Sequence, residues 1–195
     1  MLKRMFDIAL SFIGLILFSP IFFVVYLWIK IDSKGPVFFR QTRVGRHGIH
    51  FEIYKFRTMI ANAEKLGPKI TVGSDQRITR SGQFLRKSKL DELPQLVNVF
   101  VGDMSFVGPR PEVPEYVEYY PINVKNKVLS VRPGITDNAS IAFRNESEIL
   151  AQSEDPANTY IHDILPKKLD FYLDYVNSHS LLGDIKLIFK TLRAL

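Results

Sequence analysis

The amino-acid sequence predicts an α+β protein that is mostly helical, with an N-terminal membrane hairpin followed by one compact cytoplasmic domain. Three observations support this fold class: an uncharged, mostly apolar stretch from Ile8 to Ile29, one pair of short segments typical of a β-hairpin, and several helical patterns elsewhere. No repeat or low-complexity linker divides the remainder. We therefore expect residues 1–34 to form the membrane element and residues 35–195 to form one domain at the membrane interface.

The apolar stretch is interrupted near its middle by Ser19 and Pro20. A spanning helix needs about 20 apolar residues, so the length of the stretch permits a crossing. Pro20 removes a backbone donor and kinks a helix, and Ser19 is able to satisfy a backbone group that the kink frees. Each arm of about 11 residues is about 16 Å long, close to half of the hydrocarbon core. The break predicts a re-entrant helix–break–helix hairpin that enters one leaflet and returns.

Basic residues flank the apolar stretch on both sides. Lys3 and Arg4 precede it, and Lys30, Lys34 and Arg40 follow it. Because positive charge favours the cytoplasmic side, both ends are expected there. A kinked single span and a buried helix of a soluble core remain alternatives. A signal peptide fits poorly, because the stretch is too long and no small-residue cleavage pattern follows it.

The composition narrows the class of partner. The chain of 195 residues carries a net charge of +6 and has a pI of about 9.5, so we expect an anionic partner such as a membrane surface, a nucleic acid or a phosphorylated substrate. The basic residues are dispersed, and neither a recognition helix nor an aromatic RNA-binding signature is visible, which argues against nucleic acid. Zero cysteines exclude disulfides, thiolate zinc sites and a cysteine nucleophile.

The domain begins with a predicted β-hairpin and continues mainly as helices. Residues 37–43 and 51–56 read as its strands, joined by a turn at 45–48. Helices are predicted at 59–66 with Thr58 as the cap, 81–87, 88–100, 145–152 with a capping box, and 166–175. The stretch 108–111 is expected to be a stiff loop, and 132–134 a turn.

The last segment has the pattern of an interfacial amphipathic helix. Leucines and isoleucines recur at helical spacing over residues 181–192, while Lys186, Lys190 and Arg193 line another face. Such a helix is able to lie in the headgroup plane of an anionic membrane surface. An ordinary surface helix of a globular core is the alternative.

Candidate chemistry concentrates in residues 88–95, where Asp91 and Glu92 are adjacent carboxylates. Ser88 and Pro94 predict the start of a helix there, and its free backbone amides would favour an ionised Asp91. Taken alone, the same residues fit a simple helix cap. Arg110 lies between two prolines, an arrangement that holds a guanidinium for two-pronged recognition of phosphate.

The chain resembles the monotopic phosphoglycosyl transferases, bacterial sugar transferases that start glycan assembly on a polyprenyl phosphate. The resemblance covers nearly the whole chain. The length of the chain is similar to that of the minimal catalytic module of the family. Besides the basic lead-in at Lys3–Asp7 and the Ser19–Pro20 break, the matching segments are Gln41–Gly45, Lys55–Met59, Arg77–Arg80, Leu90–Gln95, Gly102–Pro111 and Arg132–Thr136.

The resemblance implies an enzyme that transfers a sugar-1-phosphate from a UDP-sugar to undecaprenyl phosphate and releases UMP. It implies that Asp91 forms a covalent phosphoglycosyl-aspartate and contacts a required Mg²⁺, while Glu92 orients Asp91 or manages a proton. The residues expected to bind substrate are Lys55, Arg86, Arg110 and Asp155. Asp155 precedes Pro156, so a helix cap is an alternative role for it.

The resemblance also implies a monotopic protein on the cytoplasmic face of the bacterial inner membrane, associated with downstream glycosyltransferases. Residues 137–146 depart from the common family pattern, so the sugar stays open. Two other functions are considered: a non-catalytic membrane scaffold for glycan-assembly enzymes, and a hydrolase that uses water as acceptor. A hydrolase has no need of the apolar N-terminus.

Overall fold

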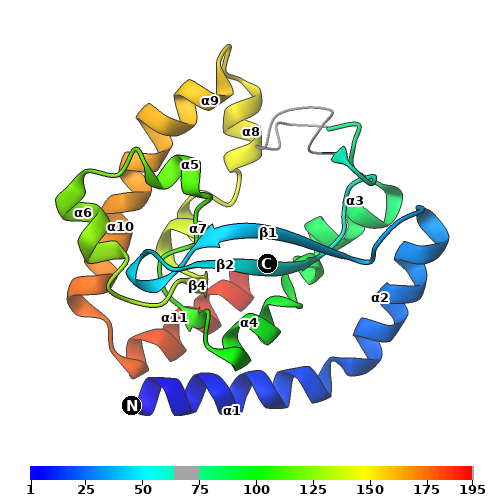
Figure 1. The fold of residues 1–195 in the computed structure, drawn as a ribbon, viewed down its shortest axis with the longest axis horizontal. Helices are drawn as coiled ribbons and strands as arrows, with labels where there is room; N and C mark the ends of the chain where they lie inside the picture. The colour runs from blue at the N-terminus through cyan, green and yellow to red at the C-terminus, as the bar shows by residue number, and fades with distance from the viewer. Residues whose placement is uncertain (64–74, 195) are drawn as a thin grey trace.

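The structure is a computed structural model that describes residues 1–63 and 75–194 (Figure 1). Helices dominate these residues, as predicted. The α-helices are α1 (Leu2–Leu17), α2 (Ser19–Asp32), α3 (Arg80–Lys87), α4 (Gln95–Val101), α5 (Pro114–Val117), α6 (Ile122–Val128), α7 (Asn138–Ala142), α8 (Glu146–Ala151), α9 (Pro156–Thr159), α10 (Leu165–Ser178) and α11 (Leu181–Ala194). The strands are β1 (Phe38–Val44), β2 (His50–Phe56), β3 (Ser105–Val107) and β4 (Gly134–Thr136). Other helical turns are η1 (Arg46–Gly48), η3 (Leu90–Glu92) and the π-helical η4 (Tyr160–Ile164).

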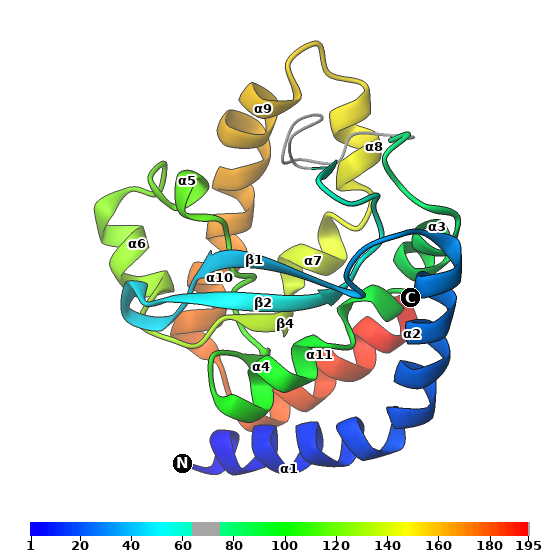
Figure 2. The same ribbon diagram turned by 45° about the vertical axis from the view of Figure 1, so that its right-hand side comes forward.

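Strands β1 and β2 form the predicted hairpin. They pair antiparallel, with Phe38 opposite Phe56 and Val44 opposite His50. The connection is short because His47 and Gly48 both adopt positive φ, 59° and 77°, a region that glycine enters freely. The hairpin crosses the middle of the molecule in both ribbon views (Figures 1 and 2).

Strands β3 and β4 form a second, parallel pair that was not predicted. Ser105 lies opposite Gly134, and Val107 lies opposite Thr136. The two backbones approach closely: a Cβ atom on Gly134 would lie 2.1 Å from the Gly108 nitrogen. Residues 132–134 were expected to form a turn, but Gly134 begins β4. The close approach of the two backbones leaves no room for a side chain there, so this position requires glycine.

The N-terminal helix pair is broken where the sequence predicts it. The helix axis bends by 58° between α1 and α2. Ser19 Oγ donates a hydrogen bond of 2.8 Å to the Ile16 carbonyl oxygen, one of the groups freed at the break. Pro20 lies in the first turn of α2. The arms are longer than expected, 16 and 14 residues, because α1 begins at Leu2. Within the described ranges, no single helix has the length and apolar character of a membrane span, whereas the bent pair meets that test jointly.

One face of α1 packs against α4, and the other is apolar and exposed. Asp7, Ser11 and Gly14 are buried on the inner face. Figure 2 shows α1 along one edge of the molecule, with α4 and α11 above it. The exposed apolar side chains of α1, α2, α4 and α11 include Met5, Phe12, Ile13, Ile16, Leu17, Phe23, Val24, Leu27, Val101, Leu182, Phe189 and Leu192.

Polar side chains at the start of α1 fasten it to the domain. Lys3 Nζ lies 2.5 Å from Asp184 Oδ2 of α11, and Arg4 donates to the Val99 and Phe100 carbonyl oxygens at 2.6 and 2.8 Å. Asp7 accepts hydrogen bonds of 3.1 and 3.2 Å from Ser105 Oγ and the Phe106 nitrogen of the β3 segment. The basic lead-in is therefore part of the domain's own packing, besides flanking the apolar stretch.

The hydrophobic interior consists of separate clusters. The largest joins α10 to α6, α7 and α8 around Tyr172. A second joins Val25 and Ile29 of α2 to Phe56 of β2 and Leu85 of α3, with Leu90 of η3 packed against it. This second cluster fixes α2, β2 and the segment 88–93 relative to one another.

Several predicted helices differ in the structure. Met59 forms a bridge with Ile78, so the helix predicted to start there is wrong over residues 59–63, and its end, 64–66, lies outside the described residues. The predicted helix 88–100 is interrupted, because Lys89 adopts a φ of 55° and α4 begins only at Gln95. Helix α8 is present, but its capping box is not formed: Asn145 makes no side-chain cap bond. The predicted helices 81–87, 166–175 and 181–192 are confirmed, as α3, α10 and α11.

Candidate active site

Asp91 lies on the turn η3, between the end of α3 and the start of α4. Ser88 ends α3, where its hydroxyl donates to the Phe84 carbonyl oxygen at 2.8 Å. The predicted role of Ser88 as the cap of a helix carrying the two carboxylates is therefore wrong. Local packing, through Leu90 and Leu93 against the second core cluster, holds the turn instead.

The Asp91 carboxylate is buried and has an unused oxygen. The side chain is 8% exposed, and Oδ1 has no hydrogen-bond partner among the residues that the structure describes. Burial raises the pKa of Asp91, Lys55 opposes that rise, and the neighbouring Glu92 adds to it. The result is a desolvated carboxylate with a lone pair free for another group.

Glu92 is clamped by two cations. Lys55 Nζ lies 2.7 Å from Glu92 Oε1, and Arg110 makes a two-pronged contact, with Nη2 on Oε1 and Nη1 at 3.4 Å from Oε2. Burial alone would raise the pKa of Glu92, but the charges of Arg110 and Lys55 outweigh it and hold that pKa well below its usual range. Glu92 is thus ionised at neutral pH and organises both cations.

The three charged partners come from three distant elements: Lys55 from β2, Glu92 from η3 and Arg110 from the segment after β3. Helix α4, which follows η3 in the chain, is tied to β2, because Asn98 Nδ2 donates to the Glu52 carbonyl oxygen at 2.7 Å and Asn98 Oδ1 accepts from the Tyr54 nitrogen at 3.0 Å. Burial lowers the pKa of Lys55, and Glu92 opposes that change. The structure brings together three of the predicted site residues with Asp91 beside them.

Arg86 and Asp155 have other surroundings. Arg86 Nε donates to Thr58 Oγ1 at 2.9 Å, and the charges of Arg86 and Asp91 attract each other, which opposes the rise in the pKa of Asp91. Asp155 is exposed and caps α9 by accepting from the Asn158 nitrogen at 3.0 Å, which matches the alternative considered for it. Neither position tests a role in substrate binding. Arg57, directly after the strand of Lys55, donates to the Ser33 carbonyl oxygen at 2.8 Å.

Residues beside Arg110 that the sequence did not single out are Glu112 and Tyr160. Glu112 is buried, and its Oε1 accepts a hydrogen bond of 2.6 Å from the Tyr160 hydroxyl. They are 48 residues apart in the chain. The one available signal was an acidic residue directly after the Pro-Arg-Pro stretch, because an acid next to a rigid loop is able to anchor it.

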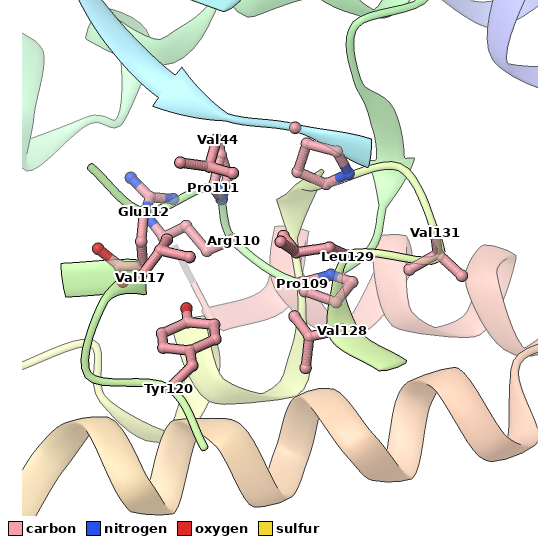
Figure 3. A pocket seen from close by; sticks show the side chains of 12 residues that line it. Val44, Pro109, Arg110, Pro111, Glu112, Val117, Tyr120, Val128, Leu129 and Val131 are labelled. Carbon is pink, nitrogen blue, oxygen red and sulfur yellow. The ribbon is translucent and has the colours of Figure 1, made fainter. Parts of the chain in front are cut away.

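A small hollow lies next to the loop of Arg110. Figure 3 shows it between the end of β1, the Pro109–Glu112 stretch, Val117 of α5, Val128 of α6 and Tyr120 on the connection between these two helices. Its volume of about 10 Å³ accommodates roughly one water molecule. It is too small for a nucleotide, so it is not a donor site in this conformation.

The carboxylates fit a metal ion only in part. The described residues hold no cluster of three or more acidic or histidine side chains able to enclose a cation. The unpartnered Oδ1 of Asp91 fits a single ligand, and Mg²⁺ is commonly held by one or two carboxylates with the rest supplied by substrate phosphates and water. Asp91 is therefore the residue suited to hold Mg²⁺ together with a bound diphosphate.

Comparison with known proteins supplies a family context. The family model described as "Bacterial sugar transferase" matches residues 1–195. The chain is 38% identical over 196 residues to an Aeromonas hydrophila UDP-N-acetylgalactosamine-undecaprenyl-phosphate N-acetylgalactosaminephosphotransferase, covering 100% of this chain and 43% of that protein. It is 39% identical over 195 residues to the Escherichia coli K12 UDP-glucose:undecaprenyl-phosphate glucose-1-phosphate transferase, covering 98% and 39%. A Salmonella typhimurium undecaprenyl-phosphate galactose phosphotransferase is 37% identical, with coverages of 97% and 39%. The chain spans less than half the length of these three relatives.

Proposed function

Because the chain belongs to the bacterial sugar transferase family, we propose that it transfers a sugar-1-phosphate from a UDP-sugar to undecaprenyl phosphate and releases UMP. The product is a polyprenyl-diphosphate sugar, which downstream glycosyltransferases extend into a bacterial glycan. The observation that supports the proposal best is the buried Asp91 carboxylate, whose Oδ1 has no hydrogen-bond partner among the described residues, beside the Lys55–Glu92–Arg110 cluster. The proposed chemistry needs a nucleophile, which is Asp91, and cations that bind phosphate, which are Lys55 and Arg110.

In the proposed first step, an Asp91 carboxylate oxygen attacks the sugar-bearing phosphorus of the donor. A new bond forms between this oxygen and the phosphorus, and the bond from the phosphorus to the bridging oxygen breaks. UMP leaves with that oxygen and its electron pair. Burial suits Asp91 to this role, since a carboxylate stripped of water is a stronger nucleophile than a solvated one.

In the second step, a phosphate oxygen of undecaprenyl phosphate attacks the same phosphorus. The bond from phosphorus to Asp91 breaks, the carboxylate is restored, and the diphosphate linkage to the lipid is formed. Arg110 and Lys55 neutralise charge on the transferring phosphoryl group in both steps. Glu92 holds the two cations in place, and its low pKa argues against a role as proton carrier while they remain paired.

Mg²⁺, with Asp91 as its protein ligand, supplies neutralisation of the donor's diphosphate when bound. Asp91 would then serve both as a ligand of the ion and as the nucleophile. Oδ1, which has no partner in the described residues, is the oxygen open to either role.

The helix pair α1–α2 supports a shallow seat in one leaflet of the bacterial inner membrane, with the domain on the cytoplasmic face. If both arms enter symmetrically, a bend of 58° inclines each by half of that angle, about 29°, to the membrane plane. Arms of 16 and 14 residues then reach a depth of about 10–12 Å, less than the half-thickness of about 15 Å of the hydrocarbon core. The exposed apolar side chains of α1 and α2, and those of α11 together with its exposed Lys186, Lys190 and Arg193, favour the same placement.

The sugar is the open part of the proposal. The three relatives described above are named for three different sugars. In this chain Asp137, at the start of the stretch that departs from the family pattern, caps α7 by accepting from the Ser140 nitrogen at 2.7 Å. A panel of donors is therefore the direct test.

We would measure UMP release from a panel of UDP-sugars with undecaprenyl phosphate and Mg²⁺ in nanodiscs. The variants are Asp91→Asn, which keeps the shape of the side chain, and Asp170→Asn, an exposed control on α10. Release with one donor, retained in Asp170→Asn and lost in Asp91→Asn, is the expected result. Silence of the folded, membrane-bound protein across the panel supports the scaffold function. With donor alone, at most one UMP per enzyme is expected, as Asp91 takes up the sugar phosphate, whereas continued release without acceptor supports a hydrolase.

A further inference from the structure

We propose that Glu112 and Tyr160 are positioning residues for Arg110, forming a buried acid–hydroxyl pair that fixes the loop from which the guanidinium projects. The inference rests on the proposed function in one respect, that Arg110 binds the transferring phosphoryl group. It adds two buried residues, Glu112 two positions after Arg110 and Tyr160 hydrogen-bonded to it, that act through the loop of Arg110.

The main chain on both sides of Arg110 is tied to other elements. Before it, the Gly108 nitrogen donates to the Thr136 carbonyl oxygen at 3.1 Å, and the Pro109 carbonyl oxygen accepts from the Gly134 nitrogen at 2.9 Å. These bonds belong to the parallel strand pair. They fix the entry of the loop, so its exit determines where the guanidinium is aimed.

The exit of the loop is held by strand β1. Arg43 Nη1 donates to the Pro111 carbonyl oxygen at 3.0 Å, and the Val44 nitrogen donates to the Glu112 carbonyl oxygen at 3.0 Å. Arg43 Nη1 also lies 3.8 Å from Glu112 Oε2. The side chain of Glu112 therefore stabilises the cation that binds the backbone of its own loop.

Tyr160 completes the environment of Glu112. Its hydroxyl donates to Glu112 Oε1 at 2.6 Å, and the side chain is 3% exposed. Burial raises the pKa of Tyr160, so the hydroxyl keeps its proton and remains a donor at physiological pH. Lys168 Nζ lies 3.4 Å from the hydroxyl and 4.8 Å from the ring centre, and it pairs with Glu146.

The position of Tyr160 is consistent with a role beyond filling space. It starts the π-helical turn η4, and such turns are frequent at functional sites because they re-aim side chains. A buried carboxylate that loses a hydrogen-bond donor is destabilised and tends to move toward another partner or water. Because Glu112 follows Arg110 by two residues across a rigid proline, its movement shifts Arg110. A misplacement of about 1 Å at a reacting centre is able to lower a rate by about 100-fold.

The test is a double-mutant cycle on kcat/KM for the donor. Tyr160→Phe removes the hydroxyl and keeps the ring, and Arg110→Lys keeps the charge but lacks the fork. We expect Tyr160→Phe to lower kcat/KM by roughly 10- to 100-fold in the wild-type background. In the Arg110→Lys background, where a flexible cation depends less on loop position, the loss should shrink to less than about threefold.

The matched control is Tyr172→Phe. Tyr172 is a buried tyrosine of the following helix, and its hydroxyl has no hydrogen-bond partner in the described part of the chain. We expect this variant to keep kcat/KM within about twofold and to melt no lower than wild type, since an unpartnered buried hydroxyl does not stabilise the fold.

Equal losses from Tyr160→Phe in both backgrounds would overturn the proposal, because they would indicate a structural effect that does not act through Arg110. No loss in either background would overturn it as well. Amide hydrogen exchange gives a readout that needs no turnover: exchange at Arg110 and Glu112 should rise in Tyr160→Phe and stay unchanged in Tyr172→Phe. If wild type shows no turnover, the proposed function fails, while the exchange experiment still decides whether this pair holds the loop.

Discussion

Replacing Gly134 by alanine should break the parallel strand pair that supports Arg110. A Cβ atom at this position would lie 2.1 Å from the Gly108 nitrogen and 2.5 Å from the Gly108 oxygen. Ordinary contacts of carbon with such atoms are about 3.5 Å, so the strands must separate by about 1.4 Å to relieve the shorter contact. The obstacle is backbone, which no side-chain rotation relieves.

The cost follows from the hydrogen bonds that separation would break. Those at risk are Gly108 to Thr136 at 3.1 Å, Gly134 to Pro109 at 2.9 Å and Ser105 to Pro133 at 2.8 Å. At about 1 kcal/mol each, their loss lowers the free energy of unfolding by about 3 kcal/mol. For a chain of this size that corresponds to a fall in melting temperature of roughly 6–12 °C.

The assay is thermal unfolding followed by circular dichroism in one detergent, with kcat/KM measured on the same samples. Gly183→Ala in α11 is the matched control, because its nearest atom is the flexible Ser180 Oγ at 3.1 Å and alanine favours a helix. We expect the control to melt within about 4 °C of wild type and to keep its activity. If Gly134→Ala melted within about 2 °C of wild type with unchanged kcat/KM, the close strand contact and its support of Arg110 would be refuted.

Four further predictions concern the site and the membrane element. Burial raises the pKa of Asp91, and the ionised form is the nucleophile. The pH profile of kcat/KM should therefore fall as pH decreases, with an apparent pKa above the ordinary aspartate value of about 3.9. A fall with an apparent pKa at or below that value would contradict a desolvated Asp91. Lys55→Met should lower kcat/KM for the donor by about 100-fold, and a loss below threefold would remove Lys55 from charge neutralisation. Chelation with EDTA should abolish UMP release and added Mg²⁺ should restore it, whereas full activity in EDTA would remove the metal from the account. Pro20→Leu should straighten the hairpin toward a membrane span and so place its two flanks on opposite sides of the membrane. Labelling of single cysteines introduced into each flank measures this without background, because the chain has no cysteine of its own. If both flanks stayed on one side, Pro20 would not be the determinant of the hairpin.

Features with a local physical cause were predictable from the sequence. The β1–β2 hairpin follows from two short segments around a glycine turn, and the break between α1 and α2 follows from a proline in an apolar helix, with Ser19 satisfying a freed carbonyl as expected. Helix α11 follows from its apolar periodicity.

Features fixed by distant contacts were not predictable. Lys89 adopts positive φ although lysine has no preference for it, so the continuous helix expected at 88–100 is broken by tertiary packing. Strands β3 and β4 have three residues each, too short for a periodic pattern, and they pair across a long separation.

The sequence predicted which residues form the site, but not how they are arranged. The resemblance to a family supplied Asp91, Glu92, Lys55 and Arg110, but no spacing indicated that one carboxylate would bind both cations. Tyr160 carried no signal at all, because its hydrogen bond to Glu112, 48 positions earlier, depends on how η4 packs against the segment after Arg110.

The most direct test of the central claim is the intact mass of the protein after incubation with its donor and Mg²⁺ in the absence of lipid acceptor. A mass increase equal to one sugar phosphate is predicted, confined by peptide mapping to Asp91, absent in Asp91→Asn and discharged when undecaprenyl phosphate is added. UMP release that requires both substrates together, with no adduct on the protein at any time, would contradict the account and indicate a single direct displacement.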